Sequence, residues 1–272
     1  MYPRAPIALV AVEIAFPGEI GSPVPSGVHR AMGDVLGDDW VIEQVQQPAF
    51  TLNLGGGHPL LPPSSLQPAP ILRFVDRGRG SSIALTAGSV SVQTIRYENW
   101  PTFRSMLETA VRATEKLLRP TGVARAGVRY IDEVRVGEVE GPEWGKWLSP
   151  TLLPPATESM TGDGWPLLTW TGAAQYRLGE EQSLVLRYGP QPAQPGFVVN
   201  PDGPLRRPGP RPEGQFFLLD FDSSWQPSVV PRWDSDDLLE TCDQLRRPVR
   251  ALFDQLITER LVEEVFKSNG DQ

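Results

Sequence analysis

Two closely spaced carboxylates are the residues of this chain whose types and spacing could carry chemistry. In Phe216-Phe217-Leu218-Leu219-Asp220-Phe221-Asp222, an apolar run leads into an Asp-x-Asp pair. Because side chains alternate along a strand, Asp220 and Asp222 are predicted to share one face at a strand end. Such a pair can hold Mg²⁺ in a nucleotidyl-transfer or nuclease-type enzyme when a third carboxylate joins it. Asp132 is the candidate for that third ligand, with Glu133 beside it as the alternative.

The simpler explanation is that the same aspartates are polar residues on the solvent face of a strand that leads into a loop. Histidine offers little further chemistry, because the chain has only His29 and His58. These two are too far apart in sequence for a His-x-x-x-His zinc motif, and no Gly-x-Ser-x-Gly nucleophile motif is present. We therefore expect a protein without catalytic activity and without a cofactor, Mg²⁺ entering only with the enzyme hypothesis.

A group of tryptophans is the second candidate site. Trp144, Trp147, Trp165 and Trp170 follow one another in a stretch rich in proline and glycine. Large flat rings in such surroundings often form protein interfaces or ligand pockets, so these four are the predicted partner-binding residues. The alternative is that the rings cover the edge of a sheet within the chain.

The overall charge narrows the range of partners. A formal net charge of −8 disfavours binding to phosphate backbones and to anionic lipid. No apolar stretch is long enough for a membrane span. Cys242 is the single cysteine, which excludes a disulfide within the chain and favours the cytoplasm. The expected partner is another protein, and a second copy of this chain is a further candidate.

Hydrophobic periodicity predicts alternating groups of strands and helices. Strands are predicted at 8–16, 40–47, 71–76, 82–87, 90–96, 125–136, 167–177, 183–188 and 215–221. Helices are predicted at 26–36 and 103–118, and a last helix begins after Asp234, whose following acidic residues suit a first turn. Arg246, Arg247 and Arg250 are assigned to the solvent face of that helix. Proline-rich segments, among them 59–70 and 190–212, are predicted loops, and the arginines around Arg206 belong to a solvated one.

The order of these elements repeats once. Each half contains a strand, a short helical segment, several antiparallel strands and a long helix. The predicted fold is therefore α+β, a tandem pseudo-repeat with TBP-like or helix-grip-like halves. Its two units are residues 1–122 and 123–272, packed as one body. In each unit a curved antiparallel sheet should hold its long helix on one face.

Three short motifs carry a family resemblance. They are the central Gly127-Val128-Arg129-Tyr130-Ile131-Asp132, the opening Val12-Glu13-Ile14-Ala15-Phe16-Pro17, and the later Leu218-Leu219-Asp220-Phe221-Asp222. Together they resemble a sporadically distributed, uncharacterised bacterial family with a central Gly-Leu-Arg-Tyr-Ile-Asn-type strand. This chain differs from that strand motif at Val128 and Asp132. The resemblance implies no activity, and the patchy distribution of the family implies a defence or toxin-related gene context.

Three functions follow as hypotheses, and the sequence favours the first because none of its residue patterns indicates catalysis more strongly than an ordinary structural role. The first is a non-catalytic protein-interaction module that uses the tryptophans. The second is the Mg²⁺-dependent enzyme built on Asp220 and Asp222. The third is a helix-grip protein that binds a small apolar ligand between helix and sheet, for which a cavity of several hundred Å³ would be the distinguishing feature.

Overall fold

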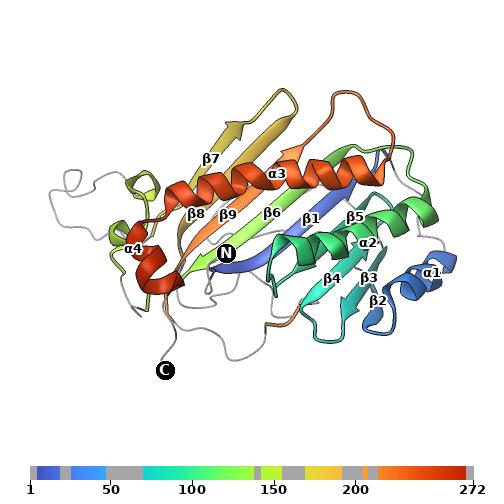
Figure 1. Ribbon diagram of the computed structural model, residues 1–272, viewed down its shortest axis with the longest axis horizontal. Helices are drawn as coiled ribbons and strands as arrows, with labels where there is room; N and C mark the ends of the chain where they lie inside the picture. Colours follow the sequence, from blue (N-terminus) through green and yellow to red (C-terminus); the bar gives the residue numbers. More distant parts are fainter. Residues whose placement is uncertain are drawn as a thin grey trace.

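One antiparallel sheet organises the molecule. A computed structural model describes residues 5–18, 26–46, 70–137, 142–154, 169–191, 205–207 and 214–267. Within these ranges the sheet has nine strands, in the order β2-β3-β4-β5-β1-β6-β9-β8-β7. Two long helices lie side by side on one of its faces (Figure 1). The prediction of an α+β fold is therefore confirmed.

The first five strands along the chain form one side of the sheet. They are β1 (Ile7–Ala15), β2 (Trp40–Gln46), β3 (Pro70–Asp76), β4 (Ser81–Leu85) and β5 (Ser89–Thr94). β3, β4 and β5 follow one another as antiparallel neighbours, and β5 then pairs with β1. β2 pairs with β3 and forms the edge.

The other four strands continue the same sheet. They are β6 (Arg125–Val134), β7 (Gly172–Arg177), β8 (Gln182–Gln191) and β9 (Phe216–Trp225). β6 pairs with β1 on one side and with β9 on the other. The two groups of strands therefore share one continuous sheet, whereas the sequence predicted a separate sheet for each half.

β9 is longer than predicted, and this changes the setting of the aspartate pair. The strand continues past Phe221 because Ser223, Ser224 and Trp225 pair with β6 and with β8. Pairing on both sides outweighs the weak strand preference of serine. Asp220 and Asp222 therefore lie within the strand and not at its end, which corrects the predicted position.

The long helices begin where the capping residues indicate. The Asn99 side chain accepts from the backbone N–H of Thr102 at the start of α2 (Trp100–Leu118). Asp234 accepts from the backbone N–H groups of Asp236 and Asp237 at the start of α3 (Ser235–Leu256). α3 packs on β6 and β9, α2 packs on β5 and α3, and α1 (Ser26–Leu36) packs against α2. After α3 come the short α4 (Glu259–Leu261) and a π-helical turn, Val262–Phe266.

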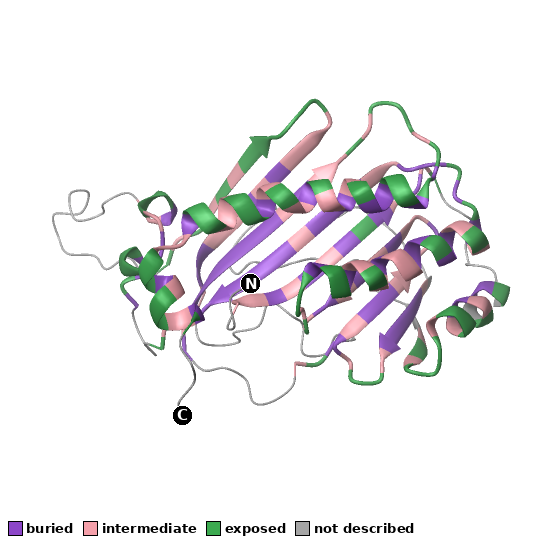
Figure 2. Ribbon diagram, in the orientation of Figure 1, coloured by how far each residue is buried: buried purple, intermediate pink, exposed green. Residues whose placement is uncertain are grey.

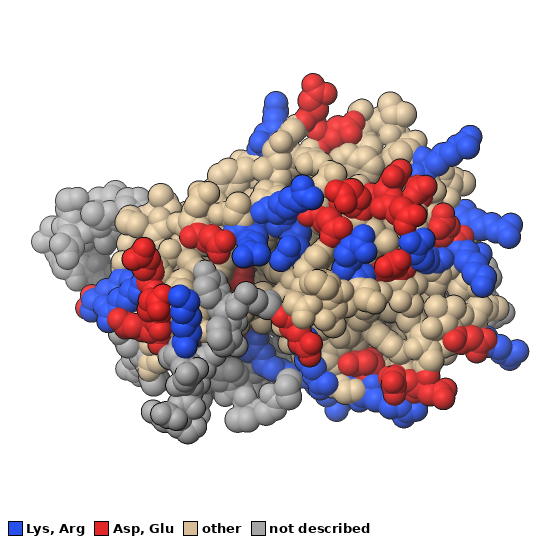
Figure 3. All heavy atoms as spheres, in the orientation of Figure 1, with Lys and Arg blue, Asp and Glu red and all other residues tan. Residues whose placement is uncertain are grey.

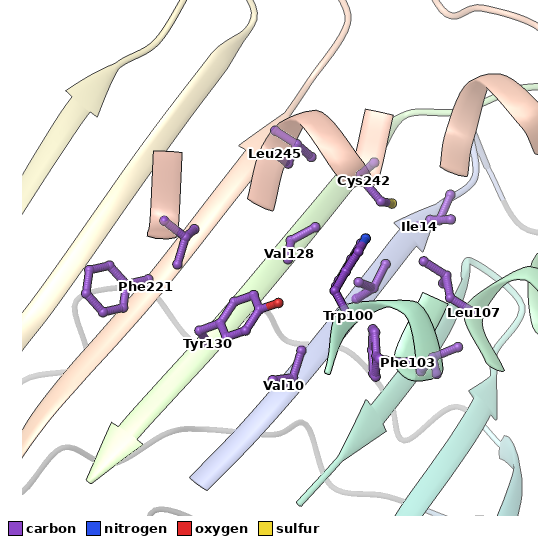
Figure 4. Close-up of a cluster of buried hydrophobic side chains, with 14 of the residues drawn as sticks. Val10, Ile14, Trp100, Phe103, Leu107, Val128, Tyr130, Phe221, Cys242 and Leu245 are labelled. Carbon is purple, nitrogen blue, oxygen red and sulfur yellow. The ribbon is translucent and has the colours of Figure 1, made fainter. Parts of the chain in front are cut away.

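The main core lies between the sheet and these two helices. Figure 2 shows the central strands as the most continuously buried part of the molecule. Val10 and Ile14 of β1, Leu107 of α2, Val128 of β6 and Leu245 of α3 are all at most 1% exposed and face one another in this layer (Figure 4). Burial of this apolar layer supplies the main driving force for docking the helices.

The described parts of the predicted proline loops differ from the prediction in one respect, because some of their residues are held by the sheet. Pro190 and Gln191 belong to β8, and Leu205 is buried. The backbone N–H of Arg206 donates to the Arg79 carbonyl at 2.8 Å, and Arg207 donates to Glu133 at 2.9 Å. The solvated loop predicted around Arg206 is thus wrong for 205–207, which is held by contacts to β6 and to the β3–β4 turn. The remainder of 192–213, with 59–69, lies outside the described residues.

Among the described helices, none combines the length and the apolar character that a membrane crossing requires.

Candidate functional site

A cavity of about 650 Å³ opens on the helix-covered face of the sheet. It lies between the start of α2 and the C-terminal half of α3. The first residue of α2, Trp100, forms part of the cavity wall. The end of the β1–β6 ladder, where Ile7 pairs with Asp132, forms another part. The described residues that line it are Ala5, Pro6, Ile7, Tyr97, Asn99, Trp100, Pro101, Tyr130, Asp132, Arg246, Val249, Arg250, Phe253, Asp254 and Lys267.

Asp132 of β6 is a buried carboxyl that lines the cavity from the side of the sheet. Its residue exposure is 3%, and no donor among the described residues makes a hydrogen bond or an ion pair with it. Burial raises the pKa of Asp132 to about 8, and the negative charge of Asp220 adds to the effect. At neutral pH this side chain is therefore mostly a neutral carboxylic acid, which can donate a hydrogen bond.

Two tyrosines and an arginine form the polar cluster of the cavity. The hydroxyls of Tyr97 and Tyr130 lie 3.2 Å apart, and their rings meet edge to face at 5.7 Å. The Arg246 guanidinium interacts with both hydroxyls and lies 5.4 Å from the centre of the Trp100 ring. Trp100 itself is held by a hydrogen bond from its indole N–H to Asp243 of α3. Figure 4 shows the Tyr130 hydroxyl directed toward Trp100.

The electrostatics of this cluster favour neutral phenols beside a charged guanidinium. Burial raises the pKa of Tyr130 far above its ordinary value, and Tyr97 adds to the shift. Burial lowers the pKa of Arg246, but its interactions with Tyr130 and Tyr97 outweigh this and raise it overall. The cluster therefore presents one positive charge, held at the side of a largely apolar space.

The other charged residues at the cavity have partners of opposite charge. Arg250 lies 3.8 Å from Asp254, and Lys267 lies 2.6 Å from Glu263. Arg246, in contrast, makes no ion pair with any carboxylate of the described residues. In Figure 3, acidic side chains gather over the first turns of α3, and basic ones lie over its middle. The prediction that Arg246 belongs to the solvent face is wrong, because this residue is half-buried against Trp100.

Asp220 and Asp222 share one face of β9, as alternation predicted, but it is the face opposite the long helices. Both oxygens of Asp220, which is 0% exposed, accept from Arg129 of β6, at 2.8 Å each. Arg187 lies 3.6 Å from Asp220, and Arg125 donates to Asp222 at 3.1 Å. These carboxylates are therefore engaged by guanidinium groups that would compete with a cation.

The predicted third ligand lies elsewhere. Ile131 is the β6 residue directly opposite Asp220, and directly opposed residues point to the same face. Asp132, the next residue, therefore faces the helices, so the predicted grouping with Asp220 and Asp222 is wrong. Glu133 is on their face but pairs with Arg135 and Arg207. Among the described residues, no three His, Cys, Asp or Glu side chains are grouped as a metal site would need.

The tryptophans are packed inside the chain. Trp144 and Trp147 are each 5% exposed, and Trp144 meets Phe217 edge-on at 5.3 Å. Trp170 is partly buried, lies 6.2 Å from Phe217 and donates to the Leu152 carbonyl. Trp165 lies outside the described residues. The rings of Trp144 and Trp170 thus lie within the chain, as in the alternative, but against the inner strand β9 and not at an edge of the sheet. Partner binding through the tryptophans stays a prediction.

Sequence reasoning missed the polar cluster of the cavity. Tyr97, Tyr130 and Arg246 come from three separate parts of the chain, and only the fold brings them together. One signal was available: Asp132 is an acidic residue on the face of its strand that also carries Val128 and Tyr130, and this face is otherwise free of charged residues.

Comparison with protein-family models and with curated proteins finds no match for this sequence.

Proposed function

We propose that this protein binds a small, mainly apolar molecule with one polar end in the cavity between α2 and α3. The observation that carries the proposal is Asp132, a buried carboxyl that faces the cavity without a donor from the described residues. A buried polar group without a hydrogen-bond partner is costly, and a ligand can supply that partner. This is the helix-grip hypothesis of the three that the sequence left open.

The size and lining of the cavity support the proposal. Pockets for small molecules usually enclose roughly 300–1,000 Å³ and combine apolar walls with a few polar groups. The volume here is about 650 Å³, and Ile7, Val249 and Phe253 provide apolar surface beside the polar cluster. The protein-interaction hypothesis has less support, because Trp144 and Trp147 are buried.

The proposed fold places this cavity at the junction of two repeats. β1 begins the first half and β6 the second, and these two strands lie next to each other in the sheet. In the first half the sheet continues outward from β1 through β5, β4 and β3. In the second half it continues outward from β6 through β9, β8 and β7. α2 follows β5 as α3 follows β9. This correspondence supports a tandem pseudo-repeat of helix-grip-like or TBP-like units. A superposition of β1 and β5 on β6 and β9 that left α2 far from α3 would reject it.

The proposed biological setting rests on one sequence motif and on the single cysteine. Membership of the sporadically distributed bacterial family rests on the motif from Gly127 to Asp132, which lies within β6 and contributes Tyr130 and Asp132 to the cavity. Cytoplasmic location rests on the single Cys242, whose thiol is buried with its pKa raised to about 12, mainly by burial. A defence-related context and a protein partner stay proposals.

Filling the cavity should abolish binding of an apolar probe. Val249 is 4% exposed and lines the cavity. We expect Val249→Phe to weaken binding of 1-anilinonaphthalene-8-sulfonate at least about tenfold, because the larger ring occupies the space that the probe needs. Fluorescence titration of the wild type and the variant measures this.

The matched control is Ala251→Phe, which adds a ring on the exposed side of the same helix. It should bind the probe as the wild type does. Melting temperatures close to that of the wild type are required for both variants. Equal binding by the wild type and both variants would place the probe elsewhere and refute the proposal.

A further inference from the structure

The polar cluster points to the class of the ligand. We propose that the cavity takes a monocarboxylic acid with an apolar chain or ring, whose carboxylate binds Arg246 and the hydroxyls of Tyr97 and Tyr130. This inference rests on the proposed function, since it names the ligand of the same cavity.

Arg246 is the residue that selects an anion. It is half-buried at the cavity and makes no ion pair within the described part of the chain, although the neighbouring Arg250 has Asp254 as its partner. The Trp100 ring, whose centre is 5.4 Å from the guanidinium, and the two phenols restrict where this group can lie. A guanidinium offers a carboxylate two parallel hydrogen bonds, a geometry that an ammonium group cannot provide.

The two tyrosines complete the anion site. Arg246 interacts favourably with both phenols, which lie beside it in the cavity wall. Because the hydroxyls are 3.2 Å apart, one can donate to the other, and the second O–H is left for the ligand. Arginine and hydroxyl donors around a single positive charge match a monoanion better than a doubly charged phosphate ester.

Asp132 is compatible with a carboxylate only while it keeps its proton. The charged or titratable groups that face it are Tyr130 on its own strand, Tyr97 before α2, and Arg246, Arg250, Asp254 and Lys267 around the cavity. Asp220 acts on it from the opposite face of the sheet. A neutral Asp132 adds a donor to the site, whereas an ionised Asp132 repels the ligand. Affinity for a carboxylate should therefore fall as the pH rises above about 8.

Three probes that share an eight-carbon alkyl group and differ in their head group test this inference. Calorimetric titrations of the full chain at pH 7 would compare octanoate, octan-1-ol and octylammonium. We expect octanoate to bind most tightly. Arg246→Gln should weaken octanoate binding roughly ten- to hundredfold, the range expected for a hydrogen bond to a charged group, and leave octanol binding unchanged.

The matched control is Arg247→Gln, which removes the adjacent, exposed arginine and should leave all three affinities unchanged. Arg246→Lys keeps the charge but loses the planar fork, so it should bind octanoate with intermediate affinity. The ranking of the probes in the wild type needs no variant, so it stays decisive if Arg246→Gln does not fold.

Each remaining outcome overturns the inference. Octanol binding as tightly as octanoate would remove the role of Arg246, and octylammonium binding most tightly would make Asp132 the group that selects the ligand. Binding of none of the three would exclude a monocarboxylic acid of this length. In each case the fluorescent probe and Val249→Phe decide separately whether the cavity binds a small molecule at all.

Discussion

Removing the Asp220 carboxylate is expected to lower the free energy of unfolding by about 3 kcal/mol. Asp220 is 0% exposed and accepts two hydrogen bonds from Arg129, so Asp220→Ala leaves that guanidinium without its main partner. Loss of one member of a buried ion pair typically costs about 3 to 5 kcal/mol. We take the lower end because 27% of the Arg129 side chain reaches solvent. Urea unfolding of the purified variant measures the change.

Asp222→Ala is the matched control, because it changes the same residue type on the same strand and face. Asp222 is 29% exposed at its side chain and, within the described part of the chain, accepts one hydrogen bond, from Arg125. Its loss should cost less than about 1 kcal/mol, as is usual for partly exposed ion pairs. Replacement of both Arg129 and Asp220 by leucine should recover most of the stability lost in Asp220→Ala. Equal, small losses in the two single variants would show that the Arg129–Asp220 pair contributes little.

The sequence alone does not predict this contribution of Asp220 to stability, because it indicates a metal ligand or a solvent-facing residue at a strand end. Alternation correctly placed Asp220 and Asp222 on one face, because that property depends only on neighbouring residues. The sequence could not show that β6 and β8 lie on both sides of β9 and bring Arg129 and Arg187 to Asp220. Strand pairing joins residues that are far apart in the chain, so local patterns do not determine it.

The helices were predictable for the opposite reason. Asn99 and Asp234 cap helices through side-chain bonds to residues two or three positions further on, so the sequence itself contains the signal. The cavity has no such local signal. It depends on where α2 begins relative to α3 and to the end of the β1–β6 ladder, which the fold alone determines. Asp132 was therefore assigned to the wrong face, and Arg246 to solvent.

Replacing Asp132 with asparagine should change how the stability of the protein depends on pH. The ordinary pKa of an aspartate is 3.8, which applies to the unfolded chain, and the folded state raises it to about 8. Between these values the folded protein keeps a proton that the unfolded chain has released. The contribution of Asp132 to the free energy of unfolding therefore falls by about 1.4 kcal/mol for each pH unit between 4 and 8, and is constant outside this window.

Asp132→Asn removes this contribution, because the amide is neutral at every pH and nearly isosteric with the carboxylic acid. The variant and the wild type should have similar stability near pH 4, and the variant should become progressively more stable as the pH rises to 8. Urea unfolding of both proteins at several pH values gives this difference directly. Subtraction of the two curves cancels the contributions of all other titrating groups, provided that the substitution leaves them unchanged.

Asp254→Asn provides the comparison at the rim of the same cavity, where the carboxylate is exposed. This variant makes the same change from carboxyl to amide at an exposed position and so controls for the substitution itself. A constant difference between Asp132→Asn and the wild type from pH 4 to 8 would mean that Asp132 ionises normally in the folded protein. That result would also remove the neutral donor on which carboxylate binding in this cavity depends.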